Sequence, residues 1–437
     1  MLQQAAIALW AASEFRNSTS GPGPGQCLGV WGHLLRWVGC WQVAAVLHKT
    51  VAGVPDSEMS RASRASARAA AQERAAVALA TLLKGNSQDS VIAFGGAAAL
   101  VGLLARGWTD AVHEQAAAAL HSLCSDNVMN KEFVRACGGV EALVVLLAPG
   151  GSAAVQARAA ALLRNLCVDN AQIRDSVTDC GGAAALVALL APGGSAVVHR
   201  EAAGALQNLC RTNSQKSQDS VRACGGVAAL VGLLAPGGPA AVQQRAAAAL
   251  RSLCWDSTQN SDSVRECGGV AALVGLLAPG GSADLHEQAA CALRSVCMNN
   301  AQNAVCVRWC GGIALLVGLL APDSPAAVQK QAAAALRNMC MNSTENKDSV
   351  RACGGIAALV GLLAPTCPAD VREKAVGALV ALTSENAQIR EAVRACGGVA
   401  ALQGALACAS SAAAHRGAAA ALRNLAHVQQ GVKQEPH

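Results

Sequence analysis

A Gly-Gly pair returns eight times along this chain of 437 residues. The intervals between pairs are 43 residues, with a single interval of 44. A period of this length is typical of helical solenoids and of β-propellers. The repeated segments are rich in alanine and have no run of β-branched and aromatic residues, which excludes a propeller. We therefore predict an all-α fold, a right-handed α-solenoid. The first glycines of the pairs are Gly95, Gly138, Gly181, Gly225, Gly268, Gly311, Gly354 and Gly397.

Each unit divides into three predicted helices. After Gly225 the segment VAALVGLLAP has leucines at helical spacing, and Pro236 ends that helix. The next segment, AAVQQRAAAALRSLC, is predicted to be a long helix. The polar segment WDSTQNS is predicted to be a loop, and DSVREC a short helix that ends at the next Gly-Gly pair. The first glycine of the pair suits a left-handed helix C-cap, and two glycines allow a sharp turn.

One position of the long helix is leucine in all eight units. Its neighbours vary from unit to unit, so we predict that this leucine packs in the core. The residues are Leu120, Leu163, Leu206, Leu250, Leu293, Leu336, Leu379 and Leu422.

The repeat pattern covers residues 61–427, with seven full repeats in 95–396 and a partial repeat at each end. Residues 1–60 break the pattern and hold four of the seven tryptophans. They are predicted to be either an irregular cap on the first repeat or a poorly ordered leader. Their apolar stretch contains His33 and Arg36, so no transmembrane segment is predicted. Residues 428–437 are a predicted C-terminal tail.

The chain has nineteen cysteines, and most follow the repeat. No zinc-type spacing is present, so we predict small, buried thiols in a reducing compartment, cytoplasmic or nuclear. Disulfides within a repeat are the alternative. One column precedes the Gly-Gly pairs, at Cys137, Cys180, Cys224, Cys267, Cys310, Cys353 and Cys396. The other follows the long helix, at Cys124, Cys167, Cys210, Cys254, Cys297 and Cys340.

No pattern for catalysis, a cofactor or a metal ion is found, because the sequence lacks a nucleophile elbow, a P-loop and an H-E-x-x-H motif. We predict that the histidines of the long helices, His113, His121, His199 and His286, are solvated. A net charge of +6 and 2% aromatic residues are low for a dedicated nucleic-acid binder. The sequence thus predicts a protein that is not an enzyme and has no cofactor and no small-molecule substrate.

The segment GGVAALVGLLAPGGPAAVQQRAAAALRSLC resembles an armadillo repeat, because three helices per unit favour armadillo over the two-helix HEAT repeat. The resemblance implies a scaffold or adaptor whose concave groove binds extended peptide segments of partner proteins. It also implies that an asparagine near the end of the long helix holds the peptide backbone, to which an amide can donate and from which it can accept. Bridging of neighbouring helices is the alternative role. The corresponding residues are Asn165, Asn208, Asn338 and Asn424, with Ser122, Ser252, Ser295 and Ala381 in the other units.

An arginine precedes this position in five units, at Arg164, Arg251, Arg294, Arg337 and Arg423. Packed helices lie roughly 8–10 Å apart, and an extended peptide advances roughly 3.3 Å per residue. An arginine could therefore meet every third residue of a ligand. Because the guanidinium fork suits carboxylates, we predict an acidic or polar ligand segment. A solvated arginine row that keeps the array soluble is the alternative.

Armadillo proteins of the nuclear-import type have tryptophan four residues before the asparagine. Here those positions are Ala161, Gly204, Ala334 and Ala420, so binding of a basic import signal is not expected. The pattern is more similar to catenin-like or vacuolar-scaffold proteins. Two alternative functions are open: a binder of nucleic acid or of an anionic surface through the arginines, and an adaptor in ubiquitin transfer, although the chain has no U-box.

Overall fold

The computed structural model describes residues 96–105, 107–211, 214–409 and 411–426. Nearly all of them belong to one compact unit, Leu100–His437, and every regular element in the described ranges is a helix. This confirms the predicted all-α solenoid. The predicted cap or leader at 1–60 and the tail at 428–437 lie outside the described residues.

Three kinds of helix alternate along the chain. The helices that follow the Gly-Gly pairs are α5 (Gly96–Gly102), α8 (Gly139–Leu146), α11 (Gly182–Ala188), α14 (Gly226–Gly232), α17 (Gly269–Gly275), α20 (Gly312–Gly318), α23 (Gly355–Gly361) and α26 (Gly398–Ala407). The long helices are α6 (Asp110–Cys124), α9 (Ala153–Leu166), α12 (Ala196–Leu209), α15 (Ala240–Leu253), α18 (Ala283–Val296), α21 (Ala326–Cys340), α24 (Ala369–Thr383) and α27 (Ala412–Ala426). The short helices are α7 (Val128–Ala136), α10 (Ala171–Asp179), α13 (Gln215–Ala223), α16 (Thr258–Glu266), α19 (Ala301–Trp309), α22 (Thr344–Ala352) and α25 (Ala387–Ala395).

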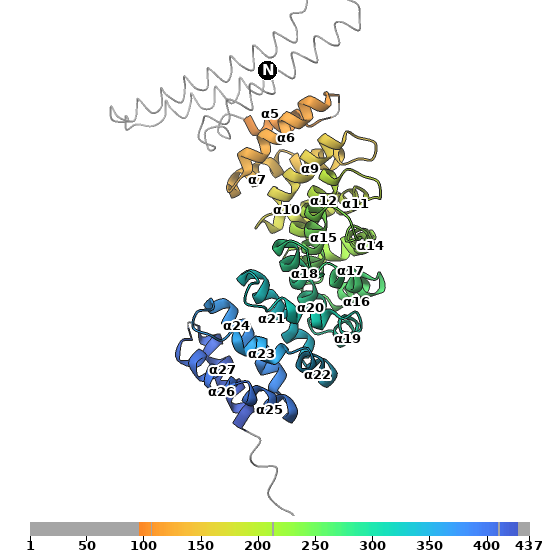
Figure 1. Ribbon diagram of the computed structural model, residues 1–437. Helices are drawn as coiled ribbons and strands as arrows, with labels where there is room; N and C mark the ends of the chain where they lie inside the picture. The colour runs from red at the N-terminus through yellow and green to blue at the C-terminus, as the bar shows by residue number, and fades with distance from the viewer. Residues whose placement is uncertain (1–95, 106, 212–213, 410, 427–437) are drawn as a thin grey trace, which may run out of the picture. The chain divides into compact units, whose positions relative to one another are not determined.

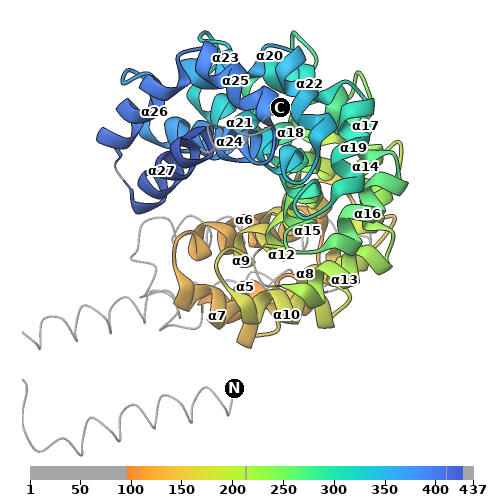
Figure 2. The ribbon, with the colours of Figure 1, turned by 90° about the horizontal axis from the view of Figure 1, so that it is seen from below.

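Within the unit Leu100–His437 the repeats follow one another in chain order (Figure 1). Each long helix packs against the long helix of the next repeat. Figure 2 shows the long helices on the inner side of a curved path and the other two kinds of helix on its outer side. We call the surface formed by the long helices the inner face.

The two glycines of each pair have different roles. The first has a positive φ of 74–79° in all seven pairs from Gly138 onward, which confirms the predicted left-handed turn. The second begins the next helix in close contact with a valine. A Cβ atom on Gly226 would lie 2.5 Å from Cγ1 of Val221 and 3.0 Å from Cγ2 of Val187, so no larger residue fits there.

The predicted loop WDSTQNS is wrong over most of its length, because α16 already begins at Thr258. The hydroxyl of Ser257 accepts a hydrogen bond from the backbone N–H of Asn260, as a helix N-cap does. The Asn260 amide is fully buried and donates to the carbonyl of Leu253, 2.8 Å away, at the end of the long helix. These polar residues therefore terminate one helix and begin the next instead of being solvated.

The leucine position of the long helix forms the core as predicted. Seven of the eight leucines are at most 1% exposed, whereas Leu422 on α27 is half-buried. Since α27 is the last described helix, no described repeat covers its far side. The core therefore continues from repeat to repeat and weakens at this end.

The two cysteine columns have different environments, although every described cysteine is free. The column that follows the long helix is buried as predicted, and burial raises the pKa of Cys167 and Cys254 to about 12. The column before the Gly-Gly pairs is not buried, so that prediction is wrong. Each of these cysteines occupies the C-cap of a short helix on the outer side, and five of the seven are exposed.

Candidate binding surface on the inner face

The arginines of the predicted groove all lie on the long helices. Arg164, Arg251 and Arg294 each contact the residue 37 positions later, on the long helix of the next repeat. We call two such residues a cross-repeat pair; in the repeat of 44 residues the separation is 38. Along the chain the pairs are His121–Arg158, Arg164–Glu201, Gln207–Arg245, Arg251–Gln288, Arg294–Gln331, Arg337–Lys374 and Val380–Gly417.

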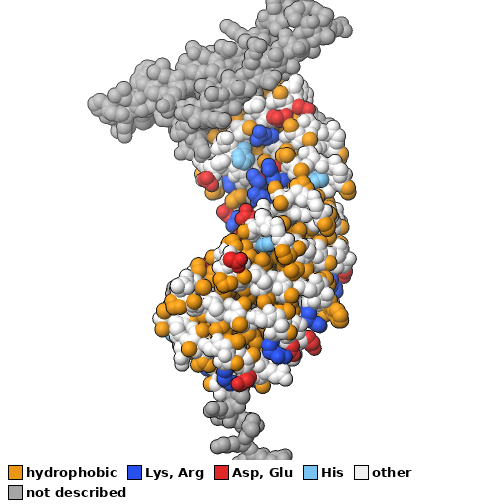
Figure 3. Space-filling model, viewed as in Figure 1, with side chains coloured by type: hydrophobic (Ala, Val, Ile, Leu, Met, Phe, Trp, Pro, Cys, Tyr) orange, Lys and Arg blue, Asp and Glu red, His pale blue; other side chains and the backbone are white. Residues whose placement is uncertain are grey.

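The pair Arg164–Glu201 is an ion pair. Nη1 of Arg164 lies 3.0 Å from Oε2 of Glu201, whose other oxygen is 2.8 Å from Nη2 of Arg200. Arg245 of the following repeat is close to this cluster, and burial, followed by the charge of Arg164, lowers the pKa of its guanidinium. Figure 3 shows basic side chains gathered over this part of the chain. A single carboxylate therefore faces three arginines here.

The next two arginines have neutral partners. Nη1 of Arg294 donates to Oε1 of Gln331 across 2.9 Å, and Nη1 of Arg251 lies 3.5 Å from Oε1 of Gln288. An amide orients a guanidinium but does not neutralise it. These two pairs are therefore ordered and still carry a full positive charge each.

The pair Arg337–Lys374 joins two cations. Among the described residues no hydrogen bond or ion pair is found for the Arg337 guanidinium, which is exposed. Nζ of Lys374 lies 2.9 Å from Oε1 of the adjacent Glu373, whose other oxygen accepts from Ser411. The hydrogen bonds from Lys374 and Ser411 hold the pKa of Glu373 below its usual value.

A hollow of about 200 Å³ opens beside this pair. It is lined by Arg337, Glu373, Lys374, Gly377, Val380 and Gly417, among others. Gly377 and Gly417 contribute no side chain to its lining, and Val380 contributes a short one. We call it the C-terminal hollow.

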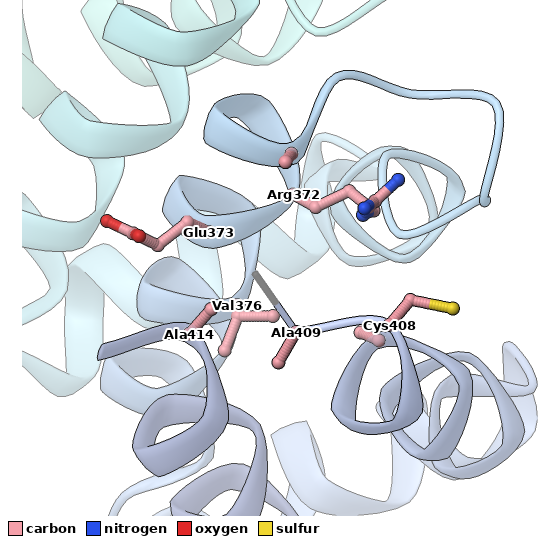
Figure 4. Close-up of a pocket in the computed structure, with 8 residues that line it drawn as sticks. Arg372, Glu373, Val376, Cys408, Ala409 and Ala414 are labelled. Atoms are coloured by element: carbon pink, nitrogen blue, oxygen red, sulfur yellow. The ribbon is translucent and has the colours of Figure 1, made fainter. Parts of the chain in front are cut away.

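The other cavity near it is far smaller. Figure 4 shows it between α24 and the residues Cys408, Ala409 and Ala414, with Arg372 and Glu373 directed away from one another. Its volume is about 10 Å³, which is room for roughly one water molecule. It therefore offers no space for a ligand side chain.

The asparagines of the predicted groove are bonded within the array. The Nδ2 atom of each donates to the carbonyl of the residue 44 positions earlier, on the preceding long helix. Asn208 donates to Arg164 across 2.8 Å, and Asn338 to Arg294 across 2.9 Å. Asn165 and Asn424 make the same bond to His121 and Val380. One amide N–H is thus used to join repeats, while the amide has a second N–H and two acceptor lone pairs.

The serines at this position lie deeper than the asparagines. Ser252 is 7% exposed and Ser295 is 1% exposed, whereas Ser122 is exposed and donates to the carbonyl of Ala118. Ser252 and Ser295 therefore offer little surface to a ligand. Arg423 is exposed on α27, beyond the last complete repeat.

The histidines differ from the prediction of solvated side chains. His113 and His199 are buried, and Nε2 of each lies 3.1 Å from the carbonyl eight residues earlier. Gln156 donates to the equivalent carbonyl in its own repeat, so histidine and glutamine have the same structural role. His121 is half-buried, and burial, followed by the positive charges of Arg164 and Arg158, lowers its pKa.

The sequence interpretation missed the second member of each cross-repeat pair. Its signal is chemical complementarity at a separation of 37 or 38 residues: glutamate opposite Arg164, glutamine opposite Arg251 and Arg294, and arginine opposite Gln207. Recognising it requires the register of one long helix against the next, which depends on the superhelix and not on the repeat length alone.

Among the described residues, no group of three or more histidine, cysteine, aspartate or glutamate side chains could hold a metal ion. None of the helices in these ranges has the length and the apolar run that a membrane crossing needs.

The model of the Armadillo/beta-catenin-like repeat family matches residues 127–168, 170–211, 257–298 and 300–341. Among solved structures, an engineered protein is 27% identical, with a TM-score of 0.56, over 87% of this chain and 98% of its own. A second engineered protein is 31% identical, with a TM-score of 0.53, over 56% of this chain and 96% of its own.

A designed armadillo repeat protein in complex with the peptide (KR)4 is 21% identical, with a TM-score of 0.50, over 55% of this chain and 98% of its own. A comparison with curated proteins gave no match. The three-helix repeat, the left-handed glycine turn and the family matches agree, and the chain contains armadillo repeats.

Proposed function

We propose that this chain is a non-enzymatic scaffold or adaptor that binds extended, acidic or polar segments of partner proteins along its inner face. The observation that carries the proposal is the charge of the cross-repeat pairs. Together with Arg423, they contain eight arginine and lysine side chains and one carboxylate, Glu201. An extended peptide with acidic side chains would be complementary to this surface.

The peptide of the designed armadillo protein described above is basic throughout. That comparison supports peptide binding by this fold, whereas the charge of the ligand depends on the side chains present. Here the columns are cationic, so we propose a ligand of the opposite sign. The buried, free thiols fit a reducing compartment, cytoplasmic or nuclear.

The test removes three arginines of the inner face in one variant. Changing Arg251, Arg294 and Arg337 to alanine should weaken binding of a fluorescent (Ser-Glu)5 peptide, measured by anisotropy. The array should not unfold, since Arg337 is exposed, Arg251 and Arg294 are half-exposed, and such surface charges contribute little to stability. Affinity capture with the intact array and with this variant identifies the cellular partners that are lost.

A matched control removes the same charge from the outer side. Arg222, Arg265 and Arg351 lie on short helices, where each pairs with an aspartate three residues earlier. Their replacement by alanine should leave peptide affinity unchanged. Equal affinity of all three proteins for the peptide would refute the proposed function.

A second candidate, binding of nucleic acid or another polyanion, uses the same cationic columns. It predicts a steep linear decrease of log affinity with log salt concentration, whereas a peptide with few charges gives a shallow one. A role as an adaptor in ubiquitin transfer is a form of the main proposal, in which the bound segment belongs to a substrate or a ligase.

A further inference from the structure

The C-terminal hollow differs from the rest of the inner face in the partner of its arginine, because Lys374 is paired with Glu373 and offers Arg337 no acceptor. Around it are two cations, Arg337 and Lys374, and one carboxylate, Glu373. In the two preceding cross-repeat pairs a glutamine accepts from the arginine, but at this position Lys374 replaces it and cannot accept. The Arg337 guanidinium is therefore left without an acceptor among the described residues.

The hollow also differs in shape. The side-chain stem of Arg337 passes over Gly377, where an added Cβ would lie 3.3 Å from its Cδ atom. Gly417 lies on the following long helix, at the position that Lys374 occupies on α24. Because both residues are glycine, the space beside Arg337 and Lys374 stays open to about 200 Å³. A planar carboxylate and its methylene stem fit such a volume.

We propose that the C-terminal hollow binds one carboxylate side chain of an extended peptide, with Arg337 donating to it as a fork and Lys374 as a second cation. This inference rests on the proposed function and specifies where one acidic side chain of the peptide lies on the inner face. An aspartate or glutamate of the ligand supplies the acceptor for Arg337 that Lys374, on the long helix of the next repeat, cannot provide. At the preceding pairs a ligand must compete with an amide already in place, so this position contributes the largest share of the preference for acidic peptides.

The key variant is Lys374→Gln, which turns this pair into the arginine–glutamine pair found one and two repeats earlier. Because the fold already contains that pair twice, the variant should fold normally, and its melting curve should match that of the unaltered protein. Binding of the fluorescent (Ser-Glu)5 peptide should weaken by roughly tenfold, as expected for loss of a charge-assisted contact. Arg337→Gln should weaken it at least as much.

The matched control is Lys216→Gln on the short helix α13, where Lys216 pairs with Asp179. It removes the same charge far along the chain from the hollow and should change the affinity little. An equal loss in both lysine variants would overturn the proposal, because it would mean that overall charge alone decides the affinity.

The outcomes separate the two proposals. If the triple arginine variant loses the peptide while Lys374→Gln and Arg337→Gln bind it as the unaltered protein does, the hollow is not a subsite and the inner face remains the binding surface. If none of these variants changes the affinity, the proposed function itself fails. Binding of a (Ser-Gln)5 peptide as tight as that of (Ser-Glu)5 would also overturn the carboxylate site.

Discussion

Arg294 and Arg337 occupy the same position in adjacent repeats, yet their surroundings are opposite. Arg294 donates to Gln331 across 2.9 Å, whereas Arg337 faces Lys374 and an open hollow. The helices beneath them are alike and the leucines of both repeats are fully buried. The repeat places an arginine at the same point of each of these two long helices. The residue on the following long helix then decides whether the guanidinium already has a hydrogen-bond acceptor.

The largest expected effect is on stability, and it shows whether the cores of the two repeats are equivalent. Leu293→Ala and Leu336→Ala should each lower the free energy of unfolding by about 2–5 kcal/mol, because both side chains are fully buried. Chemical denaturation of the two variants measures it. A much smaller loss for Leu336→Ala would show that the repeats differ in the core as well as on the surface.

The second prediction concerns the side-chain amide of Asn338, which joins the long helix of Arg337 to that of Arg294. Asn338→Ala removes the hydrogen bond to the carbonyl of Arg294 and should cost about 1 kcal/mol. Asn208→Ala, which removes the same bond in another repeat, serves as the comparison and should cost a similar amount. Unchanged stability together with weaker peptide binding would favour the ligand role of the asparagines over the bridging role.

A third prediction replaces the neutral partner of Arg294 with a carboxylate. Gln331→Glu would recreate the ion pair seen between Arg164 and Glu201 and neutralise Arg294. Since partly exposed ion pairs are worth about 0.2–1 kcal/mol, stability should rise only slightly, and affinity for the acidic peptide should decrease by roughly two- to fivefold. An increase in affinity would contradict the role of the arginine charge.

The smallest expected effect is on the pH dependence of stability. It involves the pair His121–Arg158, which would bring two cations together if His121 were protonated. Burial and the nearby arginines lower the pKa of His121, so the folded state favours the neutral ring. Its stabilising effect is present above the ordinary pKa of histidine, near 6.5, and is lost as the pH falls below that value through the lowered pKa of the folded state.

Replacement of His121 by glutamine should therefore make the melting temperature less dependent on pH between 7 and 5. A pH profile that His121→Gln does not change would contradict this account.

The parts of the structure that repeat locally could be predicted from the sequence. The glycine turns, the three helices per unit and the leucine core follow from spacing within one unit, and the turns and the core are found at the predicted residues. The short helices begin earlier than predicted because Ser257 and Asn260 act within the helix boundary instead of in a loop. The cysteines before the glycines were misplaced because a C-cap on the outer side faces solvent.

The site was less predictable because its partners lie one repeat away. The arginine column is visible in the sequence, but whether Arg164 meets a carboxylate and Arg337 meets a lysine depends on the stagger of neighbouring helices. The histidines show the same limit. His199 looks solvated among polar neighbours, yet it reaches back to a carbonyl at the end of the preceding helix.

The tight glycine at the start of each outer helix has a consequence for the inner face. Gly226 leaves no room beside Val221 and Val187, which both belong to the preceding repeat. The outer layer thus fixes how closely successive repeats approach, and with it the distance from one arginine to the next. A bulkier residue there would push neighbouring repeats apart and so change the spacing of the arginines along the inner face.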